Sequence, residues 1–242
     1  PDLLNDPAFS SIINLDLKYE WFMDRGEIFS IGAFAKTIND PVNLVSANDA
    51  TGTQRFFRAG DKAEVYGVEL EARKGLLVDK EDENLLTAGL NITYTYTTQD
   101  LKSVTGTYST NFNRDSDQLQ GASPFLINAD LSYSPSFGAY TPVANVVFSY
   151  FSDRIDALGS GQVGNIIEKG VPTLDFVLKN NVTENFEINF SAKNLLNPTI
   201  ERFRESTILG SDLATGEPLI GDAILSSYTR GINLGLQFKY SF

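Results

Sequence analysis

The sequence of 242 residues contains no cysteine and no histidine, and only one methionine and one tryptophan. A thiolate or imidazole metal site, a cysteine nucleophile and a Ser-His-Asp triad are therefore excluded. There are 19 lysine and arginine residues against 31 aspartate and glutamate residues, so the net charge is −12. A surface that follows nucleic-acid phosphates needs clustered basic residues, so this balance argues against a nucleic acid partner. No metal site and no cofactor are expected.

Long apolar runs are also missing. No run of 18 or more apolar residues occurs, so no membrane-spanning helix is predicted. The chain starts at Pro1 without an initiator methionine and without the charged and apolar leader of a signal peptide. We therefore expect that such segments were removed or that the chain is the C-terminal portion of a longer protein. The absence of cysteine fits an extracytoplasmic protein without requiring one.

What the sequence has instead is a strict two-residue alternation, which is clearest from Ile232 to Phe242. Even positions are apolar and odd positions are small or polar, which predicts a strand with two different faces. Ten steps of about 3.3 Å, tilted by about 40°, span roughly 25 Å, the height of the lipid-facing band of an outer-membrane barrel. Strands of soluble proteins cluster near 5–6 residues. The length of this strand therefore favours a membrane.

Similar segments recur along the chain, and nine strands are predicted. They are 9–22, 27–40, 63–76, 84–96, 123–135, 143–151, 173–180, 186–196 and 228–242. The facing of 27–40 and 143–151 stays open at this stage. Short turns alternate with long polar connections near 41–62, 98–122, 152–171 and 197–227. This alternation is typical of an all-β, antiparallel up-and-down transmembrane barrel, in which the long loops lie outside the cell.

Aromatic residues fall at the two ends of the predicted strands. Two belts of tyrosine and tryptophan suit the two interfaces of a membrane. The expected inner belt contains Tyr19, Trp21, Tyr133 and Tyr240, and the expected outer belt contains Tyr94, Tyr96, Tyr150 and Tyr228.

Four segments, 60–76, 118–135, 193–205 and 228–242, resemble a TonB-dependent outer-membrane receptor in their order and spacing over nearly the whole chain. The resemblance implies a plugged barrel of about 22 strands. It also implies a substrate that binds outside and moves inward with energy delivered by the TonB complex. Residues 1–242 would be the C-terminal portion, with the plug domain, TonB box and N-terminal strands absent. The ending departs from the RL-x-N-x-x-LGY type of the SusC-like branch, which weakens a polysaccharide substrate.

The last strand also resembles the C-terminal assembly signal of bacterial outer-membrane barrels. The residues that carry this resemblance are Asn233, Gly235, Phe238, Tyr240 and Phe242. It implies the barrel assembly machinery as a partner. The alternative is an ordinary last strand with an aromatic end.

Two groups of residues are candidates for function. The predicted strands turn charged residues toward the lumen, where they would contact the plug, line the transport path or simply form a hydrated wall; these are Glu20, Glu69, Glu71, Arg73, Glu187 and Lys193. The outer loops carry aromatic and arginine residues suited to stacking and to pairing with anions, namely Arg55, Phe56, Phe57, Arg58, Tyr108, Phe112 and Arg114. The alternative for this second group is packing between neighbouring loops.

The leading hypothesis is an integral protein of the bacterial outer membrane that imports a scarce nutrient, such as a metal chelate, peptide or glycan. Its expected partners are outer-membrane lipid, its own plug, the TonB complex and a surface lipoprotein. A non-transporting barrel that scaffolds surface proteins and a soluble β-sandwich binding module remain as alternatives. An enzyme is the weakest option, because without histidine only lysine or carboxylate bases are left.

Overall fold

The computed structural model describes residues 9–23, 26–46, 53–79, 83–103, 110–138, 140–161, 163–183, 185–211, 215 and 217–242. The strands of this part are β1 (Ser11–Phe22), β2 (Ile28–Asn39), β3 (Val42–Ser46), β4 (Gln54–Arg58), β5 (Lys62–Val78), β6 (Asn84–Asp100), β7 (Ser116–Asp117), β8 (Phe125–Tyr133), β9 (Thr141–Phe151), β10 (Arg154–Gly159), β11 (Ile166–Glu168), β12 (Pro172–Thr183), β13 (Phe186–Lys193), β14 (Ile200–Ser211), β15 (Pro218–Tyr228) and β16 (Asn233–Tyr240).

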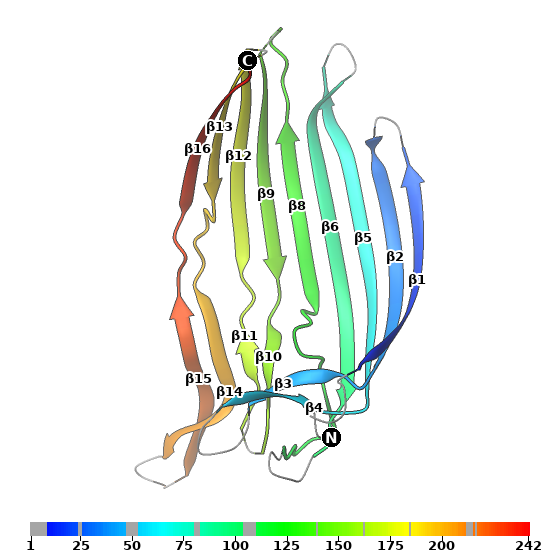
Figure 1. Ribbon diagram of the computed structural model, residues 1–242, viewed down its shortest axis with the longest axis vertical. Helices are drawn as coiled ribbons and strands as arrows, with labels where there is room; N and C mark the ends of the chain where they lie inside the picture. Colours follow the sequence, from blue (N-terminus) through cyan, green and yellow to red (C-terminus); the bar gives the residue numbers. More distant parts are fainter. Residues whose placement is uncertain are drawn as a thin grey trace.

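Nine of these strands lie side by side in a single antiparallel sheet, which we call the wall. Its order is β1-β2-β5-β6-β8-β9-β12-β13-β16, so each strand pairs with the next of the nine in chain order. These are the nine strands predicted from the alternation, and the up-and-down arrangement is confirmed. In Figure 1 the short connections and the C-terminus lie at the upper end of the wall, and the long connections lie at its lower end. We call these ends the inner and the outer end.

The register of the wall separates apolar from polar side chains. Across β13 and β16, Ile188 pairs with Phe238 on one face, while Glu187 pairs with Lys239 on the other. The same register settles the strands whose facing was open. On β9, for example, Val147 pairs with Asp130 and Asp175 and so belongs to the polar face. The wall therefore has one apolar face and one polar face across all nine strands.

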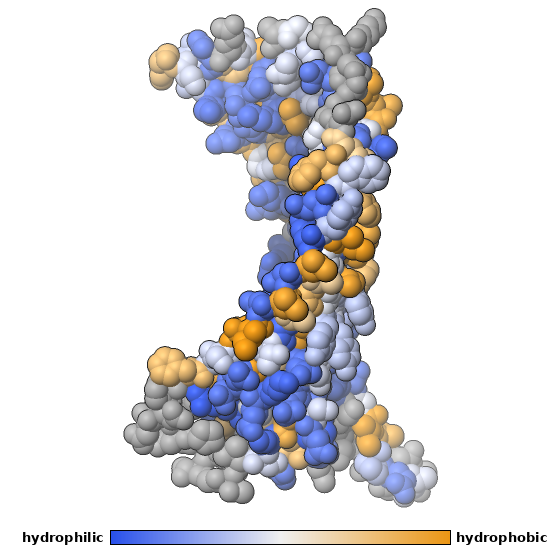
Figure 2. Space-filling model, turned by 90° about the vertical axis from the view of Figure 1, so that its right-hand side faces the viewer, coloured by the Kyte–Doolittle hydropathy of each residue, from blue (hydrophilic) through white to orange (hydrophobic). Residues whose placement is uncertain are grey.

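The apolar face is not covered by any part of the described chain. Leu17 on β1 is 77% exposed and Leu234 on β16 is 68% exposed. Figure 2 shows hydrophilic side chains along the hollowed side of the molecule and hydrophobic side chains along the opposite side at mid-height. Such an extended apolar surface is not stable in water and indicates contact with lipid. No helix of the described residues combines the length and apolar character needed to cross a bilayer.

The aromatic residues predicted to form two belts lie toward the expected ends of the wall strands, except Tyr228, which is the last residue of β15 and not part of the wall. Tyr133 and Tyr240 are near the inner ends of β8 and β16, and both are exposed. Tyr94 and Tyr96 lie in the outer half of β6 and are also exposed. On the register, Tyr96 pairs with Tyr66 of β5, which adds a ring to the outer group.

One prediction was wrong. The four long connections are not loops, because they contain β3, β4, β7, β10, β11, β14 and β15. We call these strands and the other described residues of the four connections the outer layer. Six of these strands form a second sheet in the order β15-β14-β11-β10-β3-β4. The strands β3, β4, β10 and β11 have three to six residues, which is too few to show a two-residue alternation. The strands β14 and β15 have 12 and 11 residues, but register shifts interrupt their pairing. The pairing of β3 with β10 joins Val45 to Leu158 in parallel.

The hydrophobic core lies in this outer layer. Its buried members are Val45, Ala59, Leu101, Phe112, Ile155, Leu158 and Ile167, with Phe57 and Phe203 packed against them. They come from all four long connections. The β3-β4 hairpin connects β2 and β5 in sequence. It nevertheless pairs with β10, which lies several wall strands away, after β9. In Figure 1 the hairpin accordingly runs across the outer ends of the wall strands.

Wall and outer layer meet at breaks in the last two long strands. Asn194 and Asn197, between β13 and β14, both have positive φ, as has Gly231 between β15 and β16. The Asn194 amide donates to the carbonyl of Gly231 at 2.7 Å, and the N–H of Gly231 donates to Oδ1 of Asn197 at 2.9 Å. Asparagine and glycine tolerate this left-handed conformation best. The break is therefore specified by local sequence.

Candidate functional site

The polar face of the wall is the first candidate surface, and a lysine organises its charge near β1. Lys18 lies 2.8 Å from Oε1 of Glu20 and 3.5 Å from Oε2 of Glu71. Glu71 is two strands away, on β5. Gly32 on β2 pairs with Lys18 on one side and with Glu69 on the other. Lys18 therefore bridges its own strand and β5 across β2.

Two glycines of the polar face make room for side chains of neighbouring strands. A Cβ at Gly89 would stand 2.3 Å from Oδ1 of Asp130, and one at Gly67 would stand 2.1 Å from the ring of Phe34. Each glycine therefore accommodates a side chain from the neighbouring strand. These side chains lie against the wall and do not project from it, which leaves the hollowed side of the sheet open.

The six predicted lumen residues all lie on the polar face, but they differ in their partners. Glu20 and Glu71 share Lys18, and Glu187 accepts a hydrogen bond from Nδ2 of Asn189 at 2.6 Å. Within the described residues, Glu69, Arg73 and Lys193 make no side-chain hydrogen bond or ion pair, and all three are exposed. They are therefore available to a molecule inside the lumen. That role stays a prediction.

Arg73 lines a polar hollow of about 490 Å³ in the inner half of the wall. The remaining lining is small or polar and includes Glu27, Thr87, Asp130 and Asn145. Oε1 of Glu27 accepts a hydrogen bond from the N–H of Gly75 at 3.1 Å. This hollow can offer both signs of charge to a partner.

The outer layer is the second candidate surface, and a buried polar cluster holds it together. Arg114 lies 2.6 Å from Oδ2 of Asp117 and donates to Oδ1 of Asn165 at 2.7 Å. Asn165 is 5% exposed, donates to Asp117 at 2.9 Å and accepts from the N–H of Gly159 at 2.8 Å. The cluster joins the connection after β6 to the connection between β10 and β11.

Glu205 on β14 completes this cluster. Its N–H donates to the carbonyl of Asn165 at 3.0 Å. Burial raises the pKa of the Glu205 carboxyl above its ordinary value, and the negative charge of Asp117 raises it further, while Arg114 acts in the opposite direction. Three of the four long connections are therefore tied at one point.

The predicted outer-loop residues are not brought together as a single ligand surface. Phe112 is buried and Phe57 packs against the core, which is the loop packing considered as the alternative. Arg114 is engaged with Asp117 and Asn165. Phe56 is 62% exposed, and Arg55 and Arg58 flank it and Phe57 on the same strand. Tyr108 lies outside the described residues.

Residues of the predicted assembly signal lie along β16 and just beyond it. Phe238 and Tyr240 are exposed on the apolar face, and the ring of Tyr240 meets that of Phe242 at 5.2 Å. Gly235 faces Ser191, and Asn233 pairs with Lys193 on the polar face. The geometry fits a lipid-facing last strand. The assembly role stays a prediction.

Sequence reasoning missed Lys18, Asn165 and Gln120. Gln120 accepts a hydrogen bond from the N–H of Leu44 and donates to the carbonyl of Asp156, both at 2.6 Å, so it bridges β3 and β10. The alternation places Lys18 on the same face as Glu20, but it does not predict the contact of Lys18 with Glu71 on β5. Nothing in the sequence pairs Asn165 with Arg114, because they are 51 residues apart. In the described part, no group of three or more carboxylates is arranged to hold a metal ion.

Comparison with known families decides what these two surfaces belong to. The profile of the family described as "TonB dependent receptor-like, beta-barrel" matches residues 6–195. The chain belongs to this family of TonB-dependent receptor β-barrels. Members of the family are integral to the Gram-negative outer membrane, and the family is one of receptors and transporters. No curated protein sequence gives a significant match.

Solved structures show the same fold. The ferric yersiniabactin uptake receptor FyuA of Yersinia pestis has a TM-score of 0.60 at 14% identity, over 96% of this chain and 30% of that chain. A mutant of the ferric enterobactin receptor PfeA of Pseudomonas aeruginosa has a TM-score of 0.57 at 13% identity, over 96% and 31%. The FrpB iron transporter of Neisseria meningitidis has a TM-score of 0.55 at 14% identity, over 97% and 32%. The chain thus spans about a third of the length of these receptors.

Proposed function

We propose that this chain forms part of the lumen wall and of the outer entrance of a TonB-dependent transporter that takes up a ferric chelate. The observation that carries the proposal is the register of the wall, which turns the polar residues of nine strands to one side. With the apolar face in lipid, that side surrounds an aqueous interior. A hydrated passage of this kind is what a polar cargo needs to cross the outer membrane.

The choice of cargo is supported by the similar solved structures, which are named as a ferric yersiniabactin uptake receptor, a ferric enterobactin receptor and an iron transporter. The outer layer provides a surface with its own hydrophobic core at the outer end, where a cargo would arrive. Phe56, which is 62% exposed on β4, offers an aromatic ring to an aromatic chelate. The plug, the TonB complex and a surface lipoprotein are the partners that this function requires or admits.

The test uses the complete gene product in its own outer membrane. Deleting the gene is expected to abolish uptake of radiolabelled iron supplied as one ferric chelate, and restoring the gene is expected to restore it only while the inner-membrane energy source is intact. A panel of chelates of different chemistry identifies the cargo. A correctly inserted protein whose deletion changes uptake of none of them would support the scaffold alternative and contradict transport.

A further inference from the structure

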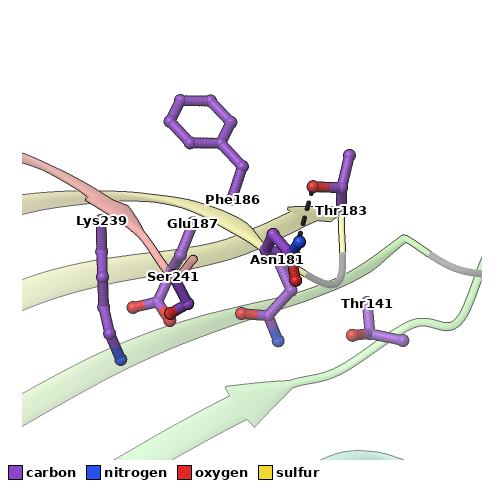
Figure 3. Close-up of a pocket in the computed structure, with 8 residues that line it drawn as sticks. Thr141, Asn181, Thr183, Phe186, Glu187, Lys239 and Ser241 are labelled. Carbon is purple, nitrogen blue, oxygen red and sulfur yellow. Dashed lines mark hydrogen bonds between the residues drawn. The ribbon is translucent and has the colours of Figure 1, made fainter.

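The hollow at the inner end of β13 and β16 is polar. It measures about 410 Å³, and within it Glu187 faces Lys239 across the β13–β16 pair. In Figure 3 these two side chains and Asn181 project to one side of the strands, while the ring of Phe186 projects to the other. The lining of this hollow therefore combines charges of both signs and turns its aromatic ring away.

A larger hollow of about 590 Å³ lies at the outer end of the wall, where β9 passes into β10, and we call it the junction hollow. Ile155 of β10, Ile167 of β11 and Phe203 of β14 pair in one row and form part of its lining. Phe125 of β8 and Tyr150 of β9 line it as well. Three aromatic rings thus meet in a hollow whose volume is typical of small-molecule sites.

The backbone around the junction hollow is held by the folded chain. The N–H of Phe125 donates to Oγ of Ser152 at 2.9 Å, and the N–H of Ser152 donates to the carbonyl of Phe125 at 2.9 Å. Behind the hollow, Ile155 and Ile167 are buried in the core of the outer layer. The hollow is therefore formed before any ligand enters it.

The charged residues of its lining are two acids and one base, namely Asp153, Glu205 and Arg154. The base is already paired, because Nη2 of Arg154 lies 2.6 Å from Oε2 of Glu168. Its guanidinium group also lies 4.8 Å from the centre of the Phe151 ring. The charge that the hollow presents to a ligand is therefore negative.

The surroundings of Glu205 favour a further positive charge. Burial raises the pKa of Glu205 most, the charges of Asp117 and Asp222 raise it further, and Arg114 lowers it. Arg114 also lies 2.6 Å from Oδ2 of Asp117, so one arginine serves two carboxylates. A cation placed beside Glu205 would reduce the repulsion between these carboxylates.

We propose that the junction hollow binds a small organic cation with an apolar body, such as an aromatic amine. The ammonium group lies on Glu205 and the apolar body lies among Phe125, Tyr150 and Phe203. A carboxylate forms a charge-assisted hydrogen bond with an ammonium group, and aromatic faces attract a cation. An anion of the same size is repelled by Asp153 and Glu205. The site does not depend on the proposed uptake of iron.

The experiment titrates the complete protein in a nonionic detergent with three probes of similar shape, followed by calorimetry against micelles without protein. Phenethylamine is expected to bind more tightly than the neutral phenethyl alcohol, and 3-phenylpropionate is expected not to bind. Glu205→Gln should lower the affinity for the amine about tenfold and leave that for the alcohol unchanged, since hydrogen bonds to charged groups contribute on this order. Glu217→Gln, at an exposed acidic position of the outer layer outside the hollow, is the matched control.

Acidity provides a second measurement. The affinity for the amine should fall as the pH is lowered through the raised pKa of Glu205, because protonation removes the charge that the ammonium group contacts. Glu205→Gln should reduce this fall. A loss of packing alone would weaken the alcohol and the amine equally at every pH.

Heat-dependent electrophoretic mobility first establishes that each variant is a folded barrel. Should Glu205→Gln not fold, Asp153→Asn keeps an oxygen for the N–H of Gly170, which Asp153 accepts at 2.7 Å, and is also expected to weaken binding of the amine. Equal affinities for the three probes, a preference for the acid, or an amine affinity insensitive to both substitutions would overturn the cation site. Absent iron uptake by the unmodified protein would contradict only the proposed function.

Discussion

The wall and the outer layer both contain antiparallel hairpins, but they differ in the exposure of their apolar side chains. In the wall, Leu17 and Leu234 are 77% and 68% exposed, whereas in the outer layer Val45 and Leu158 are fully buried. The difference lies in the surrounding solvent. Lipid accepts apolar side chains on the face of a sheet, while water forces those of the outer layer into a core. Within one chain, apolar side chains are therefore exposed to lipid in the wall and buried from water in the outer layer.

The largest effect is expected from opening the core of the outer layer. Leu158→Ala removes a fully buried side chain, and core truncations of this kind cost about 2–5 kcal/mol. Proteolysis is expected to cut the outer layer while the wall keeps its heat-dependent mobility. Leu219→Ala, at a half-exposed position of β15, is the control and should change little. Equal sensitivity of the two variants would mean that the core does not stabilise the layer.

The next largest effect is expected in the wall, from a charge placed on its apolar face. Leu236→Arg puts a cation into lipid, which costs about 2–4 kcal/mol near the bilayer midplane. Unfolding by urea in lipid vesicles measures the loss. Gln237→Arg, one residue further on the polar face, is expected to be nearly neutral because water solvates the new charge. A reversed order of these two stabilities would contradict the assignment of faces.

A smaller loss is expected from the polar cluster of the outer layer. Asn165→Ala leaves the N–H of Gly159 and the Asp117 carboxylate with fewer partners, and an unsatisfied buried group costs about 1–3 kcal/mol. Hydrogen exchange is expected to accelerate in β10, β11 and β14 but not in the wall. Ser116→Ala changes an exposed side chain of β7 in the same connection and serves as the control. Uniform acceleration throughout the sheet would show that the two regions unfold together.

The smallest effect concerns pH. The pKa of Glu205 is raised by burial, so the folded protein holds this proton more tightly than the unfolded chain. Its contribution is therefore most favourable below the ordinary glutamate pKa and declines as pH rises toward the raised value. Glu205→Gln should stabilise the outer layer slightly at neutral pH and lose that advantage on acidification, measured by proteolysis across pH. If the stability advantage of Glu205→Gln grew on acidification, the pKa of Glu205 would be lowered in the folded protein and not raised.

The alternation of the sequence determined the nine wall strands, their antiparallel order and the division of residues such as Glu187 and Phe238 between two faces. This works because a side-chain period of two is a local property, and in an up-and-down sheet each strand pairs with the next one along the chain, across short and long connections alike. The positive φ of Asn194 and Asn197 also depends on local residue type. The architecture of the wall could therefore be predicted from the sequence.

The contacts within the outer layer are evident only from the tertiary structure. Arg204 donates to the hydroxyl of Ser46 across 158 residues of sequence, and β3 reaches β10 past the outer ends of several wall strands. Short segments such as Ile166–Glu168 carry too few residues to show a period. Their burial depends on which distant segments of the chain come together in the folded protein. The same is true of Phe112 and Arg114, because the residues that contact them are distant in sequence.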